Sequence, residues 1–224
     1  MSVIHDIGKT ERSEMYLKAI LMIAHENPPV TVTKVAEFLG VSPASVSEMM
    51  RRMEANDLVA ISSAGITLTP KGLKDARRLV RRMRLAERLL SDVLGMPLQD
   101  VYEEACRLEH VISDAVEERI AAVLGDPETC PHGHPIPSAA GRFDCPLAES
   151  LADMAPGARV EVVSLPERDA DLLKYLQERG IRPGVEVLVD EVAPFNGPLF
   201  LVLNGRRHAV AREALEQVRV LPLN

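Results

Sequence analysis

The sequence lacks the features that mark membrane and secreted proteins. No apolar run approaches the roughly 20 residues that a membrane-crossing helix needs. The first residues, MSVIHDIGKTERSEM, are charged and lack the apolar core of a signal peptide. Only three cysteines occur, Cys106, Cys130 and Cys145, without the even-numbered framework of a secreted domain. These absences argue against a membrane partner and favour a location in the reducing cytoplasm.

The chain also lacks an overall positive charge, because its formal net charge is −7. Taken alone, this value argues against nucleic acid as a partner. The charge is unevenly distributed, however. Residues 1–84 hold 13 Lys and Arg against 9 Asp and Glu, whereas residues 85–224 hold 13 against 24. The basic excess in the first part indicates a polyanionic partner for that part.

The basic part contains the pattern of a DNA-reading motif. We expect a short helix over 33–40, beginning at Thr33, and a second helix after Ser42, which is a good N-cap. Residues 58–69 then indicate a hairpin. A winged helix–turn–helix places its second helix in the major groove of double-stranded DNA, where hydroxyls and guanidinium groups reach bases and phosphates. The predicted DNA-contacting residues are Ser42, Pro43, Ala44, Ser45, Glu48, Arg51 and Arg52.

The sequence after residue 69 predicts helices and then a small β-domain. Helical patterns cover 70–95 and 98–125, and their apolar residues exceed what one hairpin could cover, so a partner surface is expected. Residues 126–158 contain six prolines and little periodicity. Alternating segments follow, with a hairpin signal at Asn204-Gly205, and fit a small β-barrel. The expected fold class is α+β, with boundaries at 1–74 for the winged helix–turn–helix, 75–140 for the helical domain, 141–155 for a linker and 156–224 for the β-domain.

Three candidate metal ligands lie within one helical turn in the run EEACRLEH. Cys106, Glu109 and His110 share a helix face, since positions three and four apart are neighbours. A thiolate, a carboxylate and an imidazole suit Fe(II), Co(II), Ni(II) or Zn(II) better than Mg²⁺ or Ca²⁺. A helix with a buried thiol and an ordinary histidine fits the same residues, so the spacing leaves both interpretations open.

Several runs resemble the diphtheria toxin repressor and iron-dependent regulator family: MYLKAI at 15–20, RLAERLL at 84–90, EEACRLEHVISDAVEERI at 103–120 and GHPIP at 133–137. The resemblance covers essentially the whole chain. It implies a homodimeric, metal-activated repressor with an SH3-like C-terminal domain, and a primary metal site made of Met15, Cys106, Glu109 and His110. The manganese-type branch has carboxylates in place of Met15 and Cys106, so the soft sulfur ligands favour Fe(II).

The family's second, ancillary site departs from the pattern. Its two histidine positions hold Met83 and Tyr102 here, while the carboxylate of Glu87 is kept. In the β-domain, the nearest alignment offers Asp169. Cys130, His132 and His134 are hypothetical substitutes, and a zinc site made of these three with Cys145 is a further hypothesis. The candidate residues for the ancillary site are thus Glu87, Asp169, Met83, His134 and Cys130.

The expected function is a metal switch rather than an enzyme. A metal shared by Met15 and the distant EEACRLEH run would bias the DNA-competent arrangement and so raise the affinity for a pseudo-palindromic operator. Fe(II) is the expected metal, with Mn(II), Co(II), Ni(II) or Zn(II) as alternatives. The alternative functions are a manganese-responsive regulator of the same family, a metal-independent helix–turn–helix regulator and, from another class, a metallohydrolase.

Overall fold

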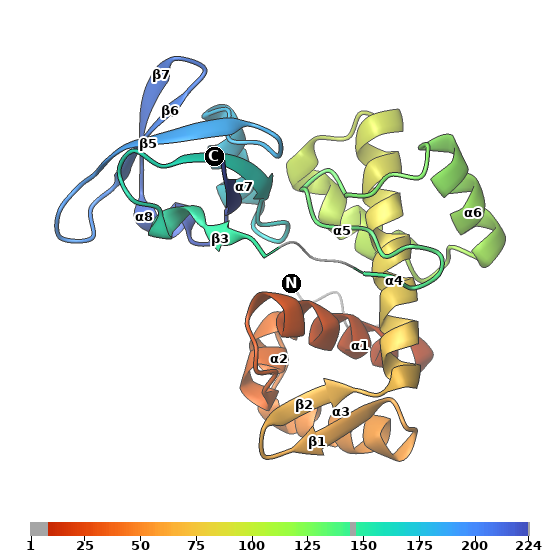
Figure 1. The fold of residues 1–224 in the computed structure, drawn as a ribbon. Helices are drawn as coiled ribbons and strands as arrows, with labels where there is room; N and C mark the ends of the chain where they lie inside the picture. Colours follow the sequence, from red (N-terminus) through yellow and green to blue (C-terminus); the bar gives the residue numbers. More distant parts are fainter. Residues whose placement is uncertain (1–8, 144–146, 224) are drawn as a thin grey trace. The chain divides into compact units, whose positions relative to one another are not determined.

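The computed structural model describes residues 9–143 and 147–223 (Figure 1). The chain divides into two compact units. The first comprises Met1–Arg82, Glu109–Val111 and Pro137–Phe143, and the second comprises Met83–Leu108, Ile112–Ile136 and Asp144–Asn224. Within the described ranges, no helix combines the length and apolar content that a membrane crossing requires.

In the described residues, the first unit contains three helices, a hairpin and the first part of a fourth helix. Gly40, in the left-handed region at φ 66°, ends the second helix and allows the turn into the third. Thr31 rather than Thr33 caps the second helix, because the Thr31 side chain accepts the backbone N–H of Lys34. The elements are α1 (Lys9–Glu26), α2 (Val32–Leu39), α3 (Pro43–Ala55), β1 (Val59–Ser62) and β2 (Gly65–Leu68). This order and the antiparallel β1–β2 pair confirm the expected winged helix–turn–helix.

A long helix, α4 (Pro70–Arg88), runs from the first unit into the second and continues as a π-helical turn over Leu89–Val93. The second unit then contains α5 (Leu98–Leu108) and α6 (Asp114–Val123). Buried residues of these helices form one apolar core, which includes Met83, Leu85, Val101 and Ile120. Tyr102 packs against this core from a partly buried position.

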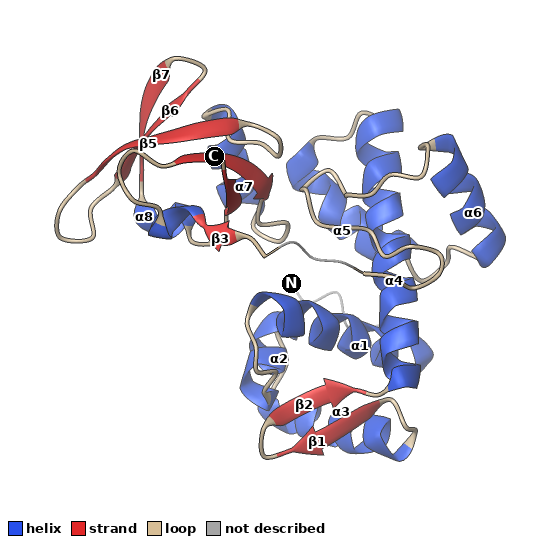
Figure 2. Ribbon diagram, in the orientation of Figure 1, coloured by secondary structure: helices blue, strands red, loops and turns tan. Residues whose placement is uncertain are grey.

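The C-terminal part of the second unit is a six-stranded antiparallel sheet with two short helices (Figure 2). The strand order is β3-β8-β4-β5-β6-β7. Asn204 and Gly205 both have positive φ, at 49° and 75°, and form the expected tight hairpin between β6 and β7. The elements are β3 (Glu149–Ser150), β4 (Arg159–Ser164), α7 (Ala170–Glu178), β5 (Glu186–Val192), β6 (Leu199–Leu203), β7 (Arg206–Val210), α8 (Arg212–Leu215) and β8 (Arg219–Pro222). The expected α+β class is therefore confirmed.

Candidate metal centres and DNA-reading helix

Helix α3 has one buried apolar face and one exposed polar face. Val46, Met50 and Met53 are buried in the core of the first unit. All the residues predicted to contact DNA, from Ser42 to Ser45 together with Glu48, Arg51 and Arg52, are exposed. The Ser42 hydroxyl accepts the backbone N–H of Ser45 and so caps the helix, while Arg52 forms an ion pair with Glu48. The exposed face thus offers hydroxyls and guanidinium groups to a ligand.

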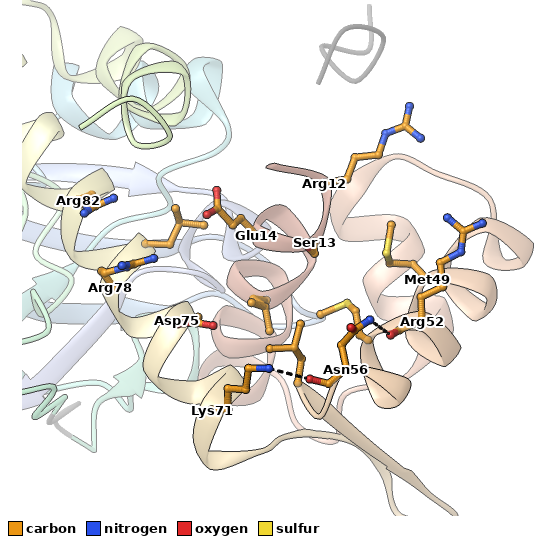
Figure 3. Close-up of a pocket in the computed structure, with 14 residues that line it drawn as sticks. Arg12, Ser13, Glu14, Met49, Arg52, Asn56, Lys71, Asp75, Arg78 and Arg82 are labelled. Carbon is orange, nitrogen blue, oxygen red and sulfur yellow. Dashed lines mark hydrogen bonds between the residues drawn. The ribbon is translucent and has the colours of Figure 1, made fainter. Parts of the chain in front are cut away.

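A pocket of about 580 Å³ lies beside the C-terminal end of α3 (Figure 3). Its wall is held together by Asn56, whose backbone carbonyl accepts from Lys71 and whose side-chain amide donates to the Arg52 carbonyl. Two acidic side chains, Glu14 and Asp75, also line the pocket. The basic lining residues are Arg12, Arg52, Lys71, Arg78 and Arg82. The pocket therefore concentrates part of the positive charge that the sequence assigns to residues 1–84.

The first candidate metal centre surrounds Glu109, which is fully buried. Lys18 of α1, itself 5% exposed, donates to Glu109 Oε1 at 2.5 Å. His110 Nε2 lies 3.4 Å from the same oxygen, and His110 Nδ1 lies 2.9 Å from Glu14 Oε2. The structure therefore brings together two of the predicted primary ligands, Glu109 and His110, against the helix that carries Met15.

The two predicted sulfur ligands belong to different units. Met15 is half-buried on α1 in the first unit, and Cys106 is half-buried on α5 in the second. Cys106 Sγ lies 3.9 Å from the sulfur of Met83, which is fully buried. Met83, a candidate for the ancillary site, is thus placed beside a residue predicted for the primary site.

A tight turn over Cys130–His134 builds the second candidate centre. The Cys130 N–H donates to the His134 carbonyl, and the Gly133 N–H donates to the Cys130 carbonyl. Gly133 has φ 92°, and a Cβ there would meet the Val163 carbonyl oxygen at 1.9 Å, so a side chain cannot be accommodated. This turn lets alternate residues converge, which an extended C-x-H spacing would not.

Two arginines of α4 attach the turn to the helix. Arg84 donates to the Pro135 carbonyl, and Arg88 donates to the Thr129 carbonyl at 2.7 Å. On its other side, the His132 carbonyl accepts from the Leu165 N–H at 2.9 Å, just after β4. Through these backbone contacts the turn lies between α4 and the β-domain.

The resulting cluster consists of Glu87, Cys130, His132 and Glu167, all buried. One potential ligand atom from each residue lies within 4.8 Å of the others. His132 Nδ1 is 3.7 Å from Glu87 Oε2 and 4.0 Å from Cys130 Sγ. Neither carboxylate oxygen of Glu87 accepts a hydrogen bond from a described residue. A buried carboxylate that accepts no hydrogen bond from the described residues, beside a thiol and an imidazole, provides a ligand set that suits a transition metal.

The two histidines of the turn differ in orientation. His132 Nε2 lies 3.2 Å from the Leu98 carbonyl, which can only accept, so in the neutral ring this nitrogen holds the proton and Nδ1 presents its lone pair to the cluster. His134 Nε2 donates in the same way to the Leu165 carbonyl at 2.9 Å. His134 Nε2 is also the nitrogen that faces the cluster, 3.6 Å from Glu167. Because this nitrogen already donates to the Leu165 carbonyl, it has no lone pair to offer a metal in the cluster.

The pKa values of these groups reflect burial and the nearby carboxylates. Burial, followed by the charge of Glu87, raises the pKa of the Cys130 thiol well above its usual value. Burial acts to lower the pKa of His132, but Glu87 and Glu167 outweigh it and raise that pKa. For His134, burial prevails and lowers the pKa.

One residue of the cluster, Glu167, did not emerge from the sequence. Asp169, two positions further on, instead caps α7, since its Oδ1 accepts the Leu172 N–H at 2.9 Å. Glu167 lies only two positions from Asp169 in the sequence, but the backbone path after β4 is what places it in the cluster. Cys145, from the zinc hypothesis, lies outside the described residues.

Family models match nearly the whole chain in three consecutive parts. The model described as iron dependent repressor, N-terminal DNA binding domain, matches residues 9–64. The model described as iron dependent repressor, metal binding and dimerisation domain, matches residues 69–138. The FeoA domain model matches residues 149–222.

Individual relatives extend over the same length. The chain is 35% identical to the iron-dependent repressor IdeR of Mycobacterium tuberculosis over 224 residues, covering 94% of this chain and 96% of that protein. It is 33% identical to the diphtheria toxin repressor of Corynebacterium diphtheriae, with coverage of 94% and 96%. A solved manganese-dependent transcriptional repressor in complex with manganese superposes with a TM-score of 0.88 at 32% identity, covering 94% of this chain and 100% of that chain.

Proposed function

Because the chain belongs to the iron-dependent repressor family, we propose that ferrous iron activates it and that Met15, Cys106, Glu109 and His110 bind this iron. The family matches confirm the function expected from the sequence, a metal-dependent DNA-binding transcriptional repressor. Members of this family are repressors, not enzymes. The DNA-binding and dimerisation domains make DNA and a second copy of the chain its partners.

The observation that supports the primary site is the pairing of buried Glu109 with half-buried His110. Their ligand atoms lie 3.4 Å apart, and Glu14 fixes the His110 ring through Nδ1, which leaves Nε2 as the nitrogen available to a metal. A thioether from Met15 and a thiolate from Cys106 would add soft ligands, which suit Fe(II) better than Mn(II). Bound at this site, the metal supplies an electrostatic link between residues about ninety positions apart in the sequence.

For the ancillary site, we infer that Glu87, Cys130, His132 and Glu167 hold a second divalent metal. Two observations support this assignment: the closeness of four buried ligand atoms, and the lack of any hydrogen bond to Glu87 among the residues that the structure describes. The ligands come from α4, the Cys130–His134 turn and the segment after β4. A metal there would stabilise the attachment of the β-domain to the helical part of the same unit.

For the DNA complex, we propose that α3 enters the major groove with Ser42–Ser45 nearest the bases. In a dimer, two such helices about one duplex turn apart would read a pseudo-palindromic operator. Arg51 and Arg52, on the next turn of the exposed face, would contact phosphates.

A metal panel tests the choice of iron. Anaerobic protein loaded with Fe(II), Mn(II), Co(II), Ni(II) or Zn(II) would be titrated, at one salt concentration, against a duplex selected from a random library by the Co(II)-loaded form. We expect Fe(II) to support binding at a lower free concentration than Mn(II). The double variant Met15→Asp/Cys106→Glu should shift the preference toward Mn(II), since carboxylates are harder ligands. Selected DNA bound equally well with chelator would contradict the metal switch, and an unchanged preference in the double variant would contradict the ligand assignment.

A further inference from the structure

The buried pair of Lys18 and Glu109 is not explained by metal binding. A lysine in a metal site supplies no ligand while it is charged, since an ammonium has only donors. Yet Lys18 is 5% exposed and its Nζ lies 2.5 Å from Glu109 Oε1, the oxygen that also faces His110 Nε2 at 3.4 Å. The ammonium thus occupies the carboxylate where a divalent metal would be expected to bind.

Two residues of α1, Glu14 and Lys18, contact this centre. Lys18 lies four positions after Glu14 and three after Met15, so it neighbours both on the helix surface. Glu14 pairs with His110, and Lys18 pairs with Glu109. Each proposed ligand of the 109–110 segment therefore has a partner of complementary chemistry on α1 before any metal binds.

We propose that Lys18 is an internal cation that neutralises Glu109 in the metal-free protein and competes with the incoming metal, so that it sets the metal concentration at which the repressor switches. This inference rests on the proposed primary site. A fully buried carboxylate needs a counter-charge, and the ammonium supplies it when metal is scarce. A dication that binds Glu109 must then displace the ammonium or remain beside it, and both events oppose binding.

The sign of the effect separates this role from simple packing. If Lys18 only joins α1 to the 109–110 segment, its removal destabilises the metal-free and metal-loaded forms alike and leaves the metal affinity unchanged. If Lys18 instead holds Glu109 in position as a ligand, its removal weakens metal binding. Only an internal competitor predicts that removal of the ammonium strengthens metal binding.

The test compares Lys18→Met, which keeps the length of the side chain and removes its charge, with Lys18→Arg, which keeps the charge. Lys34→Met is the matched control, because it removes the same charge from α2, where the ammonium contacts Asn27. All variants are made in a Cys130→Ala/Cys145→Ala background, so that Cys106 is the one cysteine left in the sequence and the thiolate-to-cobalt absorption band reports it. Co(II) is titrated against a competing chelator at a temperature where circular dichroism shows every variant folded.

We expect Lys18→Met to bind Co(II) at least about tenfold more tightly than the background protein, since a positive charge beside a dication is removed. Lys18→Arg and Lys34→Met should remain within about twofold of the background. The metal-free Lys18→Met protein should also unfold at a lower temperature, and Co(II) should raise its Tm by more than it raises that of the background. If the metal-free variant does not fold, Lys18→Gln replaces it.

Unchanged or weaker Co(II) binding in a folded Lys18→Met protein would overturn the proposal. Failure of the primary site itself gives a different result, because Co(II) would then produce no thiolate-to-cobalt band in the background protein.

Discussion

The two buried acidic centres of this protein differ in how their carboxylates are compensated. Glu109 receives the ammonium of Lys18 at hydrogen-bond distance, whereas the oxygens of Glu87 accept no hydrogen bond from a described residue and face a thiol and an imidazole. A compensated centre can remain folded without metal, which suits a sensor. A buried carboxylate that receives no hydrogen bond is stabilised when a metal stays bound to it, which suits a structural site. We therefore expect the Glu109 centre to respond to metal and the Glu87 centre to retain it.

The largest predicted effect separates the two thiols. Cys106→Ala should abolish metal-stimulated operator binding, because it removes a proposed ligand of the sensing centre. The expected fall in operator affinity at saturating metal is on the order of 100-fold. Cys130→Ala should retain most of the stimulation and lose about one bound metal per subunit. Fluorescence anisotropy on the selected duplex, together with metal analysis after gel filtration, measures both quantities. Equal loss of DNA binding in the two variants would contradict the division into a sensor and a structural site.

The second prediction exchanges each central carboxylate for its neutral isostere. Glu109→Gln removes the carboxylate that pairs with the buried Lys18 ammonium and should destabilise the metal-free protein by about 3 kcal/mol. Glu87→Gln removes a carboxylate that accepts no hydrogen bond within the described part of the chain, and it should change the same free energy of unfolding by less than about 1 kcal/mol.

Urea unfolding of the two metal-free variants, followed by circular dichroism, measures this contrast. A fall of similar size in both would mean that the Glu87 centre is as strongly compensated as the Glu109 centre.

The third prediction concerns pH at the Glu87 centre. The pKa of Cys130 is raised well above its usual value, by burial and then by Glu87, so the thiol is protonated at neutral pH. A metal binds the thiolate and must release this proton, so the metal affinity of the centre should rise with pH, by up to about tenfold per pH unit for one proton. Calorimetry in two buffers with different ionisation enthalpies measures the released proton, which Cys130→Ala should eliminate.

The sequence predicted the local parts of both centres but not the contacts between distant segments. The spacing of Cys106, Glu109 and His110 is visible within one helical turn, and the family resemblance supplied Met15. The pairing of Lys18 with Glu109 is not, because it joins residues 91 positions apart. Cys130 and His132 were hypothetical ligands in the sequence, and their convergence depends on the tight turn that the positive φ of Gly133 allows. Such contacts depend on packing, which periodicity and spacing do not encode.

The smallest predicted effect decides which carboxylate of the β-domain belongs to the Glu87 centre. Sequence alignment favoured Asp169, but this side chain caps α7, while Glu167 lies with the cluster. Asp169→Ala should therefore cost about 1 kcal/mol through the lost cap and leave the metal stoichiometry unchanged. Glu167→Gln should lose the ancillary metal instead. Thermal unfolding and metal analysis of the two variants distinguish the roles, and loss of metal in Asp169→Ala alone would return the ligand to the position that the alignment favoured.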